Sequence, residues 1–466
     1  MLLPMSPLDS MFLIGESREH PMHVGGVQVF QPPEGATARD YRLLLADALA
    51  GDRIVAPKLA KRPVRGLSTL GQWAWKEDTE IDLGYHVRRH ALPEPGGDAE
   101  LLQLCSHLHG ALLDRTRPMW EMHLIEGMAD GRFAVYVKVH HSVTDGVSAM
   151  KMLRSALSED ADERDMPAPW QLGRSTRPQP APLETSTPAA LSSIPGSAVR
   201  MARSAVGEFA GMMPSLGTTV SRAVRGQGGP MSISAPQTVF NVPISGARQF
   251  AASSWPLERL RLVAKLSRCT INDVVLAMSG GALRSYLDER GALPDSPLVS
   301  MVPVSLHDQM DTTGNGIGVL MCSLATNVAD PADRLAAVAS CMREGKEALR
   351  SMSPTQILAM SALGASPVGV SMLLGHNTLV RPPFNVIISN VAGPKAPMFW
   401  NGARLDALHP VSIPVNGQAL NITCTSNDDA LSFGITGCRR AVPNLESIPA
   451  RIGHELRLLE QAVGIS

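Results

Sequence analysis

The amino-acid sequence predicts a mixed α/β or α+β fold in two domains. A chain of 466 residues is too long for a single hydrophobic core, so we expect two or three domains and favour two. Short apolar stretches typical of strands alternate with longer stretches of helical periodicity in both halves. A segment rich in Pro, Ser, Thr and Ala, residues 166–197, separates the halves and is typical of a linker.

Each predicted element rests on the spacing of its apolar residues. In the first half, strand-like stretches cover residues 23–30 and 132–141, and a helix-like stretch covers 98–114. In the second half, helix-like stretches cover 258–291 and 331–352, and strand-like stretches cover 297–306 and 384–394. The expected units are an N-terminal domain at 1–165, a linker with a helical arm at 166–235 and a C-terminal domain at 236–466.

Charge and cysteine content argue against several classes of protein. The chain has 42 Lys plus Arg against 43 Asp plus Glu, which gives no electrostatic reason to expect nucleic acid as a partner. Six cysteines lie scattered without CxxC or CxxxH spacing, so neither a disulfide framework nor a structural zinc site is expected. The N-terminus lacks the pattern of a signal peptide. We therefore expect a cytoplasmic protein.

Two segments raise the question of a lipid surface. Residues 198–225 carry four arginines among Ala, Val and Met, which fits either a basic amphipathic helix on lipid or a helical arm packed on the body. Residues 351–380 are almost uncharged, but Pro and Gly divide them, so two short buried or lipid-facing helices fit better than one spanning helix. We expect peripheral attachment to the inner membrane or to lipid droplets. Nothing in the sequence predicts an oligomeric state.

The stretch VHHSVTDGVSAM, residues 139–150, holds the strongest candidate site. Alternation along the preceding strand places His141 on the face that carries the valines, and His140 on the opposite face. Thr144 and Asp145 resemble a helix N-cap, because apolar residues recur at helical spacing after them. The pair therefore lies at a strand end, just before a helix starts.

A histidine at a strand end, with a carboxylate and a glycine nearby, suits a general base that acts on a bound hydroxyl. Two ordinary core histidines are the alternative. A metal is not favoured, because adjacent strand residues point to opposite faces and no third ligand is suitably spaced. A GxSxG elbow, a Walker loop and a GxGxxG motif are all missing.

HHxxxDG is the signature of a superfamily that includes chloramphenicol acetyltransferase-like enzymes and the condensation domains of peptide synthetases. Six further stretches resemble one branch of it, the bacterial wax ester synthase/acyl-CoA:diacylglycerol acyltransferases of mycobacteria and other actinobacteria. They are SPLDSMFL (6–13), RPMWEMHLIEGM (117–128), INDVVLA (271–277), VPVSL (302–306), GNGIG (314–318) and SNVAGP (389–394). One departure is Met119, where the family has leucine.

This resemblance implies two chloramphenicol acetyltransferase-like domains joined by a crossover, with an active-site channel between them. It implies direct transfer of a long-chain acyl group from acyl-CoA to the hydroxyl of diacylglycerol, with long-chain alcohols as further acceptors. His141 would act as base and then as acid. Acyl-CoA would be a co-substrate, and we expect no metal and no cofactor.

The resemblance also implies roles for the neighbouring residues. His140 would support His141, Asp145 would hold the loop, and Gly146 would let the chain turn. Candidates for orienting the substrate or donating to the oxyanion are Asn272, Ser389 and Asn390; helix capping and turn formation are the alternatives for them. Pro118 and Trp120 would shape the wall of the acyl pocket. Trp73 and Trp75 are expected in the core.

Two other functions stay open at this point. The first is a condensation-type acyltransferase that takes its acyl group from a carrier protein. The second is an inactive protein that binds lipid surfaces through residues 198–225. The complete HHxxxDG motif argues against the loss of activity.

Overall fold

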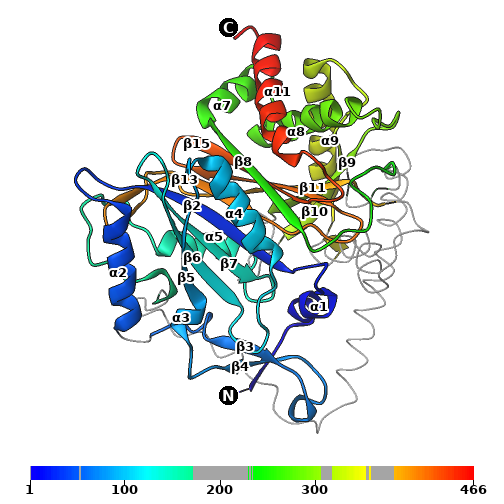
Figure 1. Cartoon of the computed structure of the whole chain (residues 1–466). Helices are drawn as coiled ribbons and strands as arrows, with labels where there is room; N and C mark the ends of the chain where they lie inside the picture. Colours follow the sequence, from blue (N-terminus) through cyan, green and yellow to red (C-terminus); the bar gives the residue numbers. More distant parts are fainter. Residues whose placement is uncertain are drawn as a thin grey trace.

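The computed structural model describes residues 2–51, 54–171, 229, 232, 235–305, 317–352, 356–357 and 382–465. The predicted amphipathic segment 198–225 and most of the stretch 351–380 lie outside these residues. Two six-stranded sheets, one three-stranded sheet and the helices packed around them make up the described part (Figure 1). The predicted mixture of helices and sheets is confirmed.

The first sheet is built mainly from the N-terminal half of the chain. Its spatial order is β12 (Phe399–Trp400), β13 (Ala403–Val411), β2 (His23–Gln31), β7 (Phe133–His140), β6 (Trp120–Glu126) and β5 (Val87–Ala91). Neighbouring strands are antiparallel except β5 and β6. The helices of this half are α1 (Pro7–Gly15), α2 (Ala38–Ala50), α3 (Leu83–His86), α4 (Asp98–Gly110) and α5 (Gly146–Ser155).

The second sheet comes from the C-terminal half. Its order is β10 (Ile317–Ser323), β9 (Val299–Ser305), β11 (Val386–Val391), β14 (Leu420–Asn427), β15 (Ala430–Cys438) and β8 (Arg248–Pro256). Strand β11 runs parallel to both of its neighbours. One large apolar cluster joins this sheet to its helices, α7 (Leu257–Leu266), α8 (Ile271–Asp288), α9 (Pro331–Arg350) and α11 (Ile448–Ala462).

A small third sheet lies beside α1 at the N-terminal end of the molecule (Figure 1). Its order is β1 (Leu2–Pro4), β4 (Ala74–Glu77) and β3 (Lys61–Val64), all antiparallel. Strands β3 and β4 form a hairpin whose tip contains a short 3-10 helix, Leu67–Thr69. Helices α7 and α11 lie at the opposite end of the molecule.

Alternation along β7 separates the two faces of the first sheet. Phe133, Val135 and Val139 belong to the cluster that also holds side chains of α2 and α5. Ala134 and Tyr136 belong to the cluster that contains residues of α4. This is the alternation that the sequence predicted, because one face of a strand receives every second side chain.

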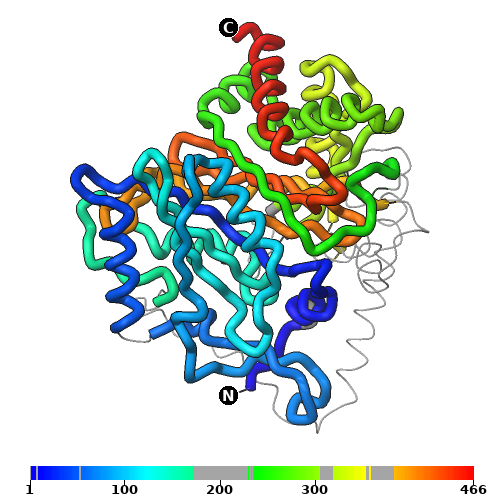
Figure 2. The backbone as a smooth tube through the Cα atoms, viewed as in Figure 1, coloured from blue at the N-terminus to red at the C-terminus, as the bar shows by residue number. Residues whose placement is uncertain are grey.

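The chain crosses between the sheets late in the sequence. Strand β13 pairs with β2 in the first sheet, although it lies within the expected C-terminal range 236–466. Figure 2 shows this orange segment running into the blue and cyan half. It passes close over β15, where a Cβ on Gly434 would collide with the carbonyl oxygen of Pro410.

The start of the expected linker is packed on the first half. Ala168 and Trp170 belong to the core of the first sheet, and the Trp170 carbonyl accepts a hydrogen bond of 2.8 Å from the Ala56 amide. Residues 168–170 of the expected linker therefore pack on the first half of the chain. In the described ranges, no helix is both long enough and apolar enough to cross a membrane.

Candidate active site

The histidine pair lies where β7 gives way to α5. The strand ends at His140, and α5 starts at Gly146 after a turn. Asp145 is the N-cap, and its Oδ1 accepts a 2.7 Å hydrogen bond from the Ser148 amide. The carboxylate satisfies one of the amides that a helix start leaves free, which is the local reason why α5 begins here.

His140 is fully buried and its two ring nitrogens have different partners. The Ser142 amide donates to Nδ1 over 3.2 Å, and the Ser142 hydroxyl lies 2.7 Å from the same atom. Since Nδ1 accepts from a backbone amide, the ring proton of the neutral form lies on Nε2. Nε2 faces the carboxylate of Glu16 at 3.4 Å, close enough for an ion pair although the angle is poor for a hydrogen bond.

Glu16 was not predicted from the sequence. Its side chain is buried just after α1, where Oε2 accepts a 2.8 Å hydrogen bond from Arg115 Nε and Oε1 accepts one of 3.1 Å from the Met22 amide. Burial opposes ionisation, but contacts with His140, the Met22 amide and Arg115 together hold the pKa of Glu16 below its usual value. An ionised Glu16 therefore stands behind His140.

His141 lies just beyond the strand and is less tightly surrounded. Its backbone amide donates a 2.8 Å hydrogen bond to the Met22 carbonyl. Its ring stacks on Phe12 of α1, with the ring centroids 4.2 Å apart and the planes 16° from parallel. Burial lowers the pKa of His141, and His140 lowers it further, while Asp145 and Asp9 oppose the shift. At neutral pH the imidazole is therefore uncharged and able to accept a proton.

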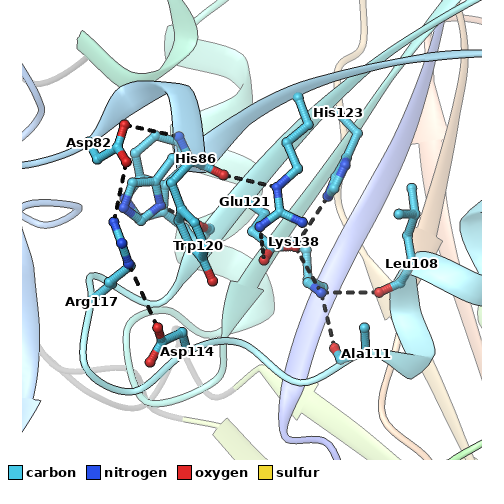
Figure 3. A network of polar contacts seen from close by, with 12 residues as sticks. Asp82, His86, Leu108, Ala111, Asp114, Arg117, Trp120, Glu121, His123 and Lys138 are labelled. Atoms are coloured by element: carbon cyan, nitrogen blue, oxygen red, sulfur yellow. Dashed lines mark hydrogen bonds and ion pairs between the residues drawn. The ribbon is translucent and has the colours of Figure 1, made fainter.

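A second charged network lies on the α4 face of the first sheet. Figure 3 shows the Lys138 ammonium between the carboxylate of Glu121, at 3.1 Å, and the carbonyls of Leu108 and Ala111, at 3.0 Å each. Lys138 thus binds the carbonyl end of α4, which favours a cation. His123 Nε2 lies 3.3 Å from the same carboxylate. The network fixes β7 two residues before His140.

Figure 3 also shows the surroundings of Trp120. Its indole N–H donates to the Leu59 carbonyl over 2.9 Å, and its ring stacks on His86 with centroids 4.5 Å apart. Trp120 and its neighbour Pro118 are both buried, and Trp120 belongs to the main cluster of the first sheet.

Met119, between them, belongs to a different cluster that reaches the histidine loop. We call it the Met119 cluster. Its members are Met5, Leu13, Leu113 and Met119, with Trp73, Trp75 and Val143 packed against them. Val143 lies two residues after His141, so this apolar cluster includes a residue of the histidine loop.

Strand β11 brings part of the second half to the same loop. A Cβ on Gly146 would lie 3.7 Å from Val391 Cγ2, so the start of α5 meets the end of β11. Ser389 shares a face of β11 with Val391, whereas Asn390 lies on the opposite face and is exposed. Alternation therefore favours Ser389 over Asn390 as the nearer of the two to the histidine loop.

Asn272 lies in the first turn of α8 and is half-buried. Thr270 is the N-cap of this helix, and Asp273 completes the capping box. Capping, the alternative role for Asn272, is therefore carried by its neighbours. The helices packed on α8 include α7, α9 and α11.

In the part of the chain that is described, no group of three or more His, Cys, Asp or Glu side chains is placed to hold a metal ion. An open hollow of about 450 Å³ is lined by residues around the start of α2, including Gln31 and Arg132. It lies at the other end of β7 from His140, about 25 Å away at the usual rise of a strand.

Comparison with known proteins places this geometry in a family. The wax ester synthase/diacylglycerol acyltransferase catalytic domain matches residues 5–275, and the C-terminal domain of the same family matches 313–460. A putative diacylglycerol O-acyltransferase of Mycobacterium tuberculosis is 48% identical over 475 residues, covering 100% of this chain and 92% of that protein. A probable diacylglycerol O-acyltransferase of the same organism is 45% identical, covering 99% of each chain.

Comparison with solved structures leads to the same family. The wax ester synthase/diacylglycerol acyltransferase from Marinobacter aquaeolei VT8 superposes with a TM-score of 0.79 at 40% identity, covering 99% of this chain and 100% of that one. The first condensation domain of the CDA synthetase matches with a TM-score of 0.56 at 16% identity, covering 100% and 97%, which shows a shared fold. The fold is thus that of condensation-type acyltransferases.

The chain belongs to the wax ester synthase/diacylglycerol acyltransferase family. As such it is an O-acyltransferase of lipid biosynthesis, as the resemblance implied.

Proposed function

We propose that this protein transfers a long-chain acyl group from acyl-CoA to the free hydroxyl of diacylglycerol, with His141 as the general base. The observation that carries the proposal is the position of His141 at a strand end, with its ring stacked on Phe12 and its pKa lowered by burial. Acyl-CoA is a co-substrate in this proposal, and no cofactor is required.

The reaction needs one proton acceptor and one nucleophile. His141 takes the proton of the acceptor hydroxyl, and the oxygen attacks the thioester carbonyl. The tetrahedral intermediate collapses, the C–S bond breaks, and the imidazolium gives its proton to the departing CoA sulfur. Such a base contributes about 10² to 10⁴ in rate; orientation of the substrates and stabilisation of the oxyanion supply the rest.

The other candidate residues support this step. In the proposal, His140 positions His141 with Glu16 and Arg115 behind it, Asp145 holds the loop by capping α5, and Gly146 lets α5 approach β11.

The remaining candidates bear on the substrates. Ser389 is preferred over Asn390 for orienting the acceptor or the oxyanion because of their positions on β11, and Asn272 stays a candidate for the same role. Pro118 and Trp120 remain proposed wall residues of the acyl pocket. Met119 joins them because the Met119 cluster includes Val143 of the histidine loop.

The domain arrangement belongs to the same proposal. We propose two chloramphenicol acetyltransferase-like domains with a channel between them. Strands β12 and β13, from the C-terminal part of the chain, complete the sheet of the N-terminal domain. Long-chain alcohols are further acceptors in this proposal. A carrier protein as acyl donor, and binding to lipid without catalysis, are the alternatives that the assay must separate.

The test is release of CoA from palmitoyl-CoA by the purified protein, with dioleoylglycerol or hexadecanol as acceptor. His141→Ala should lower acceptor-dependent release by about 10² to 10⁴ while the protein stays folded. His140→Ala should retain more activity, because its ring acts through His141. Turnover near that of the wild type in the His141 variant would refute the assignment. No release by folded wild-type protein with either acceptor would favour a carrier-protein donor or a binding role.

A further inference from the structure

The tip of the β3–β4 hairpin displays two leucines to solvent. Leu67 is 98% exposed and Leu70 is 91% exposed, more than any other large apolar residue in the described part of the chain. Single exposed apolar residues are common on protein surfaces. Packing among the described residues does not explain two nearly complete exposures three residues apart at one tip.

Hydrogen bonds fix the shape of this tip. Arg65 Nε donates to the Gly71 carbonyl over 2.7 Å, the Gly71 amide donates to the Gly66 carbonyl over 3.0 Å, and the Thr69 hydroxyl donates to the same carbonyl over 3.0 Å. Leu70 adopts a left-handed conformation with φ of 50°, which is unfavourable for a leucine. A built turn therefore holds both side chains outward.

Other exposed apolar side chains lie at the same end of the molecule. Leu2 of β1 pairs with Lys76 of β4, and α1 carries exposed Met11 and Ile14. Figure 1 shows β1, α1 and the hairpin together at this end. We call this set the docking face; its members are Leu2, Met11, Ile14, Leu67 and Leu70.

The hairpin carries more basic than acidic residues. Residues 58–76 contain five Lys or Arg and no carboxylate. Arg62 forms a 3.6 Å ion pair with Asp78, and Lys61 lies opposite Glu77 in the strand register. Lys58, Arg65 and Lys76 are exposed, and no ion pair joins any of the three to a described carboxylate. Arg65 lies beside the tip, and Lys58 and Lys76 lie towards the base of the hairpin, so its net charge is positive and complements an anionic lipid surface.

The docking face is continuous with the candidate active site. Trp73 and Trp75, which follow the tip in sequence, pack in the Met119 cluster together with Val143 of the histidine loop. On α1, exposed Met11 is next to Phe12, whose ring stacks on His141. A lipid surface held by the docking face would therefore lie on the side of the molecule from which apolar side chains lead to His141.

We propose that the docking face seats the protein on an anionic phospholipid surface, with Leu67 and Leu70 inserted among the acyl chains and the hairpin cations on the headgroups. One part of this inference rests on the proposed function, namely that the docked lipid supplies the acyl acceptor. Its binding half stands independently of catalysis.

The test is co-sedimentation of the full chain with vesicles of phosphatidylcholine and phosphatidylglycerol, beside vesicles of phosphatidylcholine alone. Leu67→Asp/Leu70→Asp should weaken binding about 100-fold, because each inserted leucine contributes about tenfold. The matched control is Leu262→Asp/Leu266→Asp on α7, whose leucines are 38% and 50% exposed at the opposite end of the molecule. Lys58→Gln/Lys76→Gln should weaken binding to the anionic vesicles and reduce its dependence on salt.

Equal binding by the Leu67/Leu70 variant and the wild type would overturn the proposal. The proposal would also be overturned if the wild-type protein did not bind vesicles but self-associated through these leucines, which sedimentation velocity would show. A second readout is the ratio of turnover on vesicle-held dioleoylglycerol to turnover on a short soluble alcohol, which should fall in the Leu67/Leu70 variant alone. Vesicle binding through the leucines without CoA release from any acceptor would refute the proposed function and leave the docking surface standing.

Discussion

Two adjacent histidines have different surroundings, and the difference assigns their roles. His140 is enclosed between Ser142 and Glu16, so its proton is held on Nε2. The His141 ring stacks on Phe12, and no ion pair joins it to a carboxylate among the described residues. One imidazole is fixed by its hydrogen bonds, and the other is free to exchange a proton with a substrate.

The lowered pKa of His141 predicts the pH dependence of acyl transfer. A base works when deprotonated, so kcat/KM should hold level at neutral pH and fall on an acidic limb whose midpoint lies below 6.5. Asp9→Asn should move that midpoint further down, because the Asp9 carboxylate favours the charged imidazole. A pH–rate profile of both proteins checks this. A midpoint of the acidic limb above 6.5, or a midpoint that is the same in Asp9→Asn and the wild type, would contradict this prediction.

Glu16 offers a test of how His140 is held. Glu16→Gln removes the charge that faces Nε2 and Arg115, so we expect kcat to fall while KM for acyl-CoA changes little. Breaking a hydrogen bond to a charged group should also cost about 1–3 kcal/mol of unfolding free energy. Glu16→Asp, which keeps the charge, should restore part of kcat. Equal losses in both variants would point to packing as the cause.

At the scale of single elements, the start of α5 has a structural role that can be measured. Asp145→Ala should cost about 1 kcal/mol and speed exchange of the Ser148 amide about fivefold, because the cap is lost. Asp145→Ser should preserve the cap. Hydrogen exchange followed by mass spectrometry distinguishes the two variants. Unchanged exchange in the alanine variant, with turnover lost, would assign Asp145 to catalysis instead.

Elements with strong local signals could be predicted from the sequence. The alternation of β7, the Asp145 cap and helices such as α4 and α9 follow from spacing and capping residues within a few positions of each other. The expected helix at 258–291 is divided into α7 and α8 at a turn where Arg268 has a positive φ.

The partners of the histidines could not be predicted in this way. Glu16 reaches His140 from a distant part of the sequence and is itself held by Arg115, and a lone glutamate after a short helix carries no signal of its own. The pairing of β13 with β2 was likewise invisible, because strand patterns predict that a strand exists and not which strand it joins.

At the scale of the whole molecule, the close crossing of β13 over β15 joins the two sheets. Gly434→Ala would place a methyl group against the Pro410 carbonyl, and we expect a loss of about 1–3 kcal/mol in unfolding free energy. Gly66→Ala is the control, because open space surrounds that position and its φ is extended. Urea unfolding monitored by tryptophan fluorescence measures both. Equal urea midpoints for Gly434→Ala and Gly66→Ala would show that β13 and β15 can move apart at the crossing without a loss of stability.

The late pairing of β13 has a consequence for the order in which the protein assembles during synthesis. Until β13 pairs with it, strand β2, near the N-terminus, is an edge of the first sheet, and its partner β13 ends at Val411. A ribosome must therefore complete most of the chain before β2 is covered on that side. Until then the nascent first half presents an open strand edge, the kind of surface on which other chains can add. A fragment that stops at residue 171 would keep that edge permanently.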